Sequence, residues 1–182
     1  MIARHPWLSV AIAIFGVAWG ANQFAPMLRF YTTTVGLSEA TVSATFGIYG
    51  VGVATQPIAR HIGNKDPAIL NRLGLVASTF AFALGAAYTG TAASPLLYLA
   101  CIVAGIAYGM NLLYGFLALG HAPRGVRVAQ YYVFVYVGFA FPPVIVSLGE
   151  HVPVSAVLLC FAGLTAALAL VPRAAAVAAA EG

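Results

Sequence analysis

The chain has 182 residues, of which 62% are hydrophobic and only 7% are charged. Soluble domains carry about 25% charged residues, so this composition argues against a water-soluble fold and predicts an all-α membrane protein. The formal net charge of +4 comes from eight Lys and Arg residues scattered between apolar runs. Because they form no basic stripe, we expect no nucleic-acid partner.

Six long apolar runs follow one another, and short breaks rich in charged or turn-forming residues separate them. A helix needs about 20 apolar residues to cross the hydrocarbon core of a bilayer. We therefore expect a single transmembrane domain over residues 1–182, with a short tail over 172–182. The six expected helices cover residues 7–30, 40–59, 68–89, 95–119, 128–148 and 154–171.

The positive charges predict the orientation, because Lys and Arg in short loops are retained in the cytoplasm. With the amino terminus inside, Arg29 is the one cation of the eight on the outer side. We expect a multi-pass protein of the inner or plasma membrane with both termini cytoplasmic. The first run is also compatible with a cleaved signal peptide, but its apolar character continues to Phe30, beyond an ordinary signal core.

The first three spans and the last three spans, residues 7–89 and 95–171, have similar patterns of polar residues, as in transporters built from repeats. The first and fourth spans carry the most polar interiors. We expect these side chains to line a substrate cavity: Asn22, Gln23, Arg29, Tyr108, Asn111 and Tyr114. The alternatives are that each amide bonds across a helix interface and that Arg29 extends to the headgroups.

Glycine and proline interrupt the second and fifth spans at corresponding positions, which is typical of moving or cavity-forming helices. The candidate helix breaks are Gly47, Gly50, Pro57, Pro142 and Pro143. Gly105 and Gly109 form a small-xxx-small pair that predicts a close approach of two helices. The third and sixth spans are the least polar, and we expect them at the lipid-facing edge.

Three stretches, at residues 19–26, 36–50 and 57–65, resemble the amino-terminal six-helix half of the major facilitator superfamily, in particular its bacterial efflux members. The resemblance implies two three-helix inverted repeats and alternating access for a small solute. It also implies a second six-helix half, which a homodimer would replace. The family's cytoplasmic gate loop falls on Gln56, Arg60, His61, Gly63 and Lys65.

Several positions depart from the family pattern, among them Gln56 and His61 in the gate loop and Phe141 and Val146 in place of glycines of the fifth span. Arg60 stands where the family has an acidic gate residue, and Cys101 stands where efflux members carry a buried arginine. The alternative function is therefore a truncated or non-transporting membrane protein that packs against a partner transporter. Cys101 and Cys160 lie far apart without ligand-spaced neighbours, so we expect no metal. The sequence has no P-loop, no dinucleotide fingerprint and no nucleophile with a nearby base, so we expect no cofactor and no enzymatic activity. A membrane-embedded enzyme is the third alternative.

Overall fold

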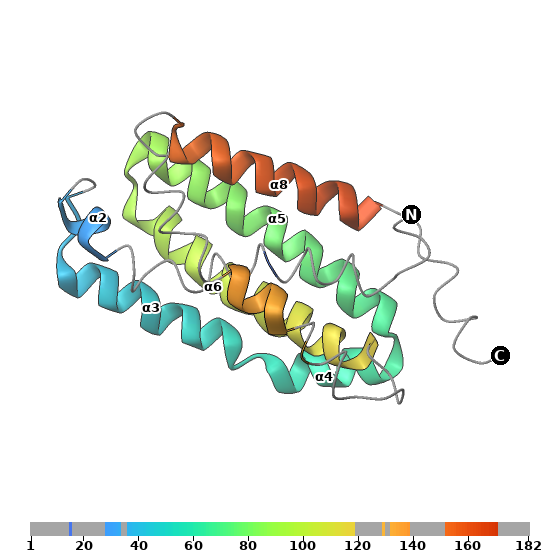
Figure 1. Ribbon diagram of the computed structural model, residues 1–182. Coiled ribbons are helices and arrows are strands. Elements are labelled where there is room, and N and C mark those ends of the chain that lie inside the picture. The colour runs from blue at the N-terminus through green and yellow to red at the C-terminus, as the bar shows by residue number, and fades with distance from the viewer. Residues whose placement is uncertain are drawn as a thin grey trace.

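The computed structural model of the chain describes residues 15, 28–33, 36–118, 129, 132–138 and 152–170. Within these residues all regular structure is helical (Figure 1). The expectation of an all-α fold is therefore confirmed for this part of the chain. The helices with assigned bounds are α2 (Leu28–Thr33), α3 (Glu39–Val53), α4 (Gln56–Lys65), α5 (Pro67–Thr91), α6 (Ser94–Ala118) and α8 (Val154–Leu170).

α5 and α6 form an antiparallel hairpin of two 25-residue helices. Asp66 caps the start of α5, because its carboxylate accepts hydrogen bonds from the backbone N–H groups of Ala68 and Ile69 at 2.8 and 3.1 Å. At the other end, Ala92 takes a left-handed conformation with φ of 52°, and α6 begins two residues later. A two-residue connection places the two helices side by side.

Among the described helices, α5 and α6 are long and apolar enough to cross a membrane. At 1.5 Å per residue each is about 37 Å long, which exceeds the hydrocarbon core of about 30 Å. α8 is also apolar but has only 17 residues. The pair is compatible with membrane association.

The longer helices pack in the spatial order α3, α6, α5 and α8 (Figure 1). α5 therefore has a neighbour on each side, α6 on one and α8 on the other, and α4 packs across one end of the α5–α6 hairpin. Phe82 is buried against α8, whereas Phe80 is 60% exposed. The third expected span is thus central among the described helices and exposes only part of its surface.

The second expected span, 40–59, is divided in the structure. α3 continues through Gly47 and Gly50 and ends at Val53, and α4 starts at Gln56 after a short turn. Pro57 explains the position of the break, because its ring lacks an N–H and would clash with the carbonyl of residue 53 in a continuous helix. The remaining candidate breaks, Pro142 and Pro143, lie outside the described residues.

Candidate functional site

The expected cavity residues are only partly within the described chain. Asn22 and Gln23 lie outside it, and Arg29 belongs to the short helix α2. The other three candidates lie on α6. Tyr108 is half-buried beside α3, Asn111 is fully buried, and Tyr114 packs in a cluster with Ala59 and Leu70. Tyr108 also packs against the cluster that contains Tyr114, and a cavity lined by the three side chains stays a prediction.

Asn111 lies in the interface between α6 and α5. Its side-chain N–H donates to the hydroxyl of Ser78 on α5 at 3.1 Å and to the carbonyl of Ala107 at 2.9 Å. Gly74 makes room for it, since a Cβ added at Gly74 would lie 2.9 Å from the Asn111 side-chain oxygen. Asn111 therefore makes the interhelical hydrogen bond that was the alternative to a cavity-lining role.

The contact between Tyr49 of α3 and Tyr108 of α6 is the feature closest to a solute-binding site. Their ring centroids are 6.1 Å apart. Tyr49 is 7% exposed, and its hydroxyl has no hydrogen-bond partner among the described residues. A buried hydroxyl without a partner costs free energy, so such a group suggests a role that the resting packing does not fulfil.

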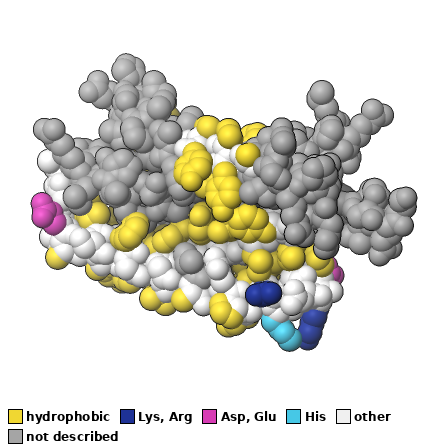
Figure 2. Space-filling model, turned by 60° about the horizontal axis from the view of Figure 1, so that its bottom comes forward, with side chains coloured by type: hydrophobic (Ala, Val, Ile, Leu, Met, Phe, Trp, Pro, Cys, Tyr) yellow, Lys and Arg dark blue, Asp and Glu magenta, His cyan; other side chains and the backbone are white. Residues whose placement is uncertain are grey.

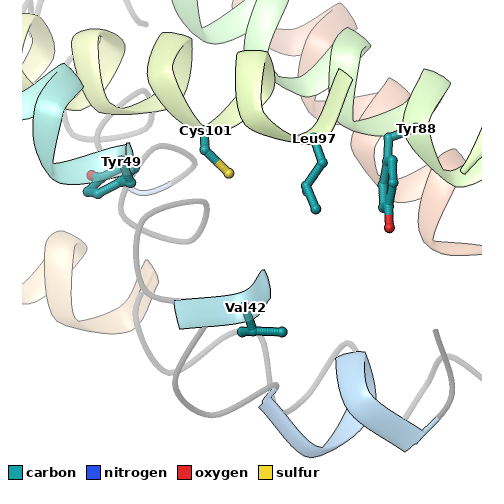
Figure 3. Packing of buried hydrophobic residues seen from close by; sticks show 5 residues of the cluster. All are labelled: Val42, Tyr49, Tyr88, Leu97 and Cys101. Carbon is teal, nitrogen blue, oxygen red and sulfur yellow. The ribbon is translucent and has the colours of Figure 1, made fainter. Parts of the chain in front are cut away.

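Tyr49 belongs to a cluster of buried residues at the junction of α3, α5 and α6. Figure 3 shows Leu97 and Cys101 of α6 and Tyr88 of α5 pointing toward the side on which Val42 of α3 lies. Cys101 is the position where the family resemblance expects an arginine. This cluster is therefore apolar and aromatic, with hydroxyl and thiol groups as its polar atoms.

Close backbone contact beside this cluster joins α3 to α6. A Cβ added at Gly52 would overlap the carbonyl oxygen of Ile102 and lie 2.8 Å from both Gly105 Cα and Ile106 N. Only glycine fits at this crossing. The close helix approach predicted at Gly105 is confirmed.

The expected gate residues lie on the helix α4, not in a loop. Gly63 is buried against Leu70 of α5 and Leu117 of α6, and Gln56 is half-buried. The outer face of α4 exposes three of the expected gate residues, Arg60, His61 and Lys65. The neighbouring acid, Asp66, is engaged in the cap of α5. The described residues therefore hold no charge network that resembles a gate.

Sequence reasoning missed three further features. Tyr49 lies inside a stretch that carried the family resemblance, but a tyrosine in an apolar run gives no separate signal. The hydroxyls of Thr79 on α5 and Thr165 on α8 share a hydrogen bond of 2.9 Å. Asn71 on α5 is fully buried, and neither its side-chain oxygen nor its nitrogen has a partner in the described part of the chain.

The described residues contain no group of three or more His, Cys, Asp or Glu side chains placed to hold a metal ion. Comparisons of the chain with family models, curated proteins and solved structures found no match.

Proposed function

We propose that this chain is an integral membrane protein of the inner or plasma membrane that moves a small solute by alternating access. In this proposal six transmembrane helices form two three-helix repeats. A second six-helix half, or a second copy, completes the transport path. The two long apolar helices α5 and α6 support the membrane location, and the sequence resemblance supports the efflux-type mechanism.

The observation that carries the transport proposal is the buried Tyr49 hydroxyl beside Tyr108. Alternating access requires helices that shift against each other, and a buried polar group without a protein partner is suited to bind a solute in the path between them. The α3–α6 contact offers both. Gly52 permits a close crossing, and the Tyr49 hydroxyl can donate a hydrogen bond to a solute or its water.

Transport assays with matched tyrosine variants test this proposal. The full chain is expressed in cells, and export of ethidium and of radiolabelled sugars is measured against cells without it. Tyr49→Phe keeps the ring and removes the hydroxyl, so we expect export to fall about tenfold, from the loss of a bond worth about 1.5 kcal/mol. Tyr136→Phe is the control, because Tyr136 is 63% exposed and lies outside the α3–α6 contact. Equal export by both variants would contradict the role of Tyr49.

Thiol labelling tests the topology separately. Ser94 and Lys65 lie at opposite ends of α5. In a Cys160→Ala background, Ser94→Cys is expected to react with an impermeant maleimide added to intact cells, whereas Lys65→Cys is expected to react only after lysis. Cys160 is replaced because it is exposed. Labelling of Lys65→Cys in intact cells would contradict the cytoplasmic assignment of the termini.

A non-transporting membrane protein that packs against a partner transporter is the second candidate. The burial of Asn111 favours it, since its amide bonds to Ser78 across the α5–α6 interface. This candidate predicts no export of any probe, together with recovery of a complex with a second membrane protein after cross-linking in cells. Export of a probe by the purified chain in vesicles would contradict it.

A further inference from the structure

One end of the described helices carries an exposed group of basic residues. Arg60 and Lys65 lie on the outer face of α4, and Arg72 follows near the start of α5. None of the three pairs with a carboxylate in the described part of the chain. The adjacent acid, Asp66, directs its carboxylate to backbone N–H groups of α5. These positive charges are therefore available to an external anion.

An exposed apolar stripe on α5 begins beside this basic group. Ile69, Leu73, Val76 and Phe80 follow at i, i+4, i+7 and i+11, which places them on one face of the helix. All four are exposed, Ile69 by 51% and Phe80 by 60%. Over these 11 steps the stripe runs about 16 Å along the helix axis. Figure 2 shows basic and histidine side chains gathered at one end of a face with apolar side chains (yellow) nearby.

The basic group is held in place by the packing of α4. The inner face of α4 is buried through Ala59 and Gly63, and Gly63 lies against Leu70 and Leu117. An added Cβ at Gly63 would lie 2.7 Å from a Leu70 methyl carbon, so α4 packs closely against α5 at this point. α4 therefore packs across the end of the hairpin through its inner face and exposes its charges on the outer face.

Charge at one end and apolar surface along the helix match the two parts of a phospholipid. We propose that α4 and the first turns of α5 bind an anionic phospholipid. Arg60, Lys65 and Arg72 contact the headgroup, and the stripe from Ile69 to Phe80 contacts an acyl chain. A soluble anion would use the charges but not the stripe. A nucleic acid would need basic residues along the helix where these apolar ones lie. The inference depends on the membrane location and not on transport.

Native mass spectrometry of the full chain in detergent tests the proposal. The protein is titrated with phosphatidylglycerol and with phosphatidylcholine of the same acyl chains. Each basic residue near an anionic headgroup contributes about 1 kcal/mol, which corresponds to about fivefold in affinity. We expect phosphatidylglycerol to bind more tightly than phosphatidylcholine. In the triple variant R60Q/K65Q/R72Q the affinity for phosphatidylglycerol should fall about 100-fold, and the affinity for phosphatidylcholine should not change.

Two controls separate the headgroup from the chain. Glu39→Gln removes a charge at the start of α3 and is expected to leave both affinities unchanged. Leu73→Asn is expected to lower the affinity for both lipids by a similar factor, because it alters only the apolar stripe. Circular dichroism establishes that each variant keeps its helix content. If the triple variant loses helix content, the three single variants are measured in its place. Each is expected to bind phosphatidylglycerol with about fivefold lower affinity.

Three results would overturn the proposal. These are equal affinity for the two lipids, a triple variant that binds phosphatidylglycerol as the parent does, and displacement of the lipid by millimolar inorganic phosphate. The last result would identify a site for the free anion. A chain that exports no probe but discriminates the lipids would contradict the transport proposal and leave this one supported.

Discussion

α6 contacts α3 on one side and α5 on the other, and the two interfaces differ in kind. Toward α5, a directional hydrogen bond joins Asn111 to Ser78. Toward α3, the contacts are tyrosine rings and the backbone crossing at Gly52. A side-chain hydrogen bond fixes the register of two helices, whereas backbone and ring contacts allow small sliding shifts. We therefore expect movement between α3 and α6, with α5 and α6 moving as a unit.

The largest expected effect follows from filling the α3–α6 crossing. In Gly52→Ala the new methyl group would overlap the backbone of α6, which cannot rotate away as a side chain can. We expect a loss of about 3 kcal/mol in the free energy of unfolding, measured by sodium dodecyl sulfate titration in micelles. Gly50→Ala is the control, because no atom lies within 4 Å of its added Cβ. Equal free energies of unfolding for the two variants would contradict the close backbone contact between Gly52 and α6.

A smaller loss is expected when the α5–α6 interface is filled. In Gly74→Ala the new methyl group meets the Asn111 side chain, which can rotate but then gives up its bond to Ser78. We expect a loss of about 2 kcal/mol in the same titration. Gly85→Ala supplies the comparison on the same helix, since its Cβ would lie at an ordinary 3.4 Å from Leu158. A parent-like Gly74→Ala would show that the Asn111–Ser78 bond does not hold this interface.

The two buried asparagines are expected to respond in opposite directions. Asn111→Leu removes hydrogen bonds to Ser78 and Ala107, so the free energy of unfolding should fall by about 1 kcal/mol. Asn71→Leu replaces an amide that has no partner in the described chain, so stability should stay equal or rise by about 1 kcal/mol. A large loss for Asn71→Leu would reveal a bond to a residue outside the described ranges.

The smallest effect is expected between α5 and α8. Thr79→Val and Thr165→Val keep the shape of the side chain and remove the shared hydrogen bond. Interhelical hydrogen bonds in membranes average about 0.6 kcal/mol, so a double-mutant cycle should give a coupling of that size. A coupling energy above about 2 kcal/mol would indicate that this hydrogen bond is a major contribution to the packing of α8 against α5.

The positions of proline and glycine were the most predictive parts of the sequence. Pro57 indicated a helix break close to where α3 ends, and Gly105 indicated a close helix approach. Pro57 breaks the helix through its own ring, without reference to a distant partner. Gly105 permits the close approach through its missing side chain, although the sequence did not indicate that Gly52 is its partner. Gly47 and Gly50 differ, because a helix tolerates glycine and only its neighbours decide whether it bends.

The partners of polar side chains could not be predicted. Helical periodicity placed Tyr108 and Asn111 on one face, but it does not reveal which neighbour that face meets. The low polarity of the third span predicts a lipid-facing edge, although Ser78 and Thr79 lie within this apolar run. Both hydroxyls bond to carbonyls of their own helix, which hides their polarity from hydrocarbon. Their bonds to other helices emerge only from the fold.

In the proposed membrane topology, the turn between α5 and α6 is the part of the hairpin that crosses the bilayer during synthesis. Residues 91–94 are Thr, Ala, Ala and Ser, so no ionised group has to pass through the hydrocarbon when this turn crosses. The basic residues Arg60, Lys65 and Arg72 all lie at the opposite end of the hairpin and resist translocation. In that topology the two helices can enter the bilayer together as a loop, with the basic residues remaining on the side of synthesis.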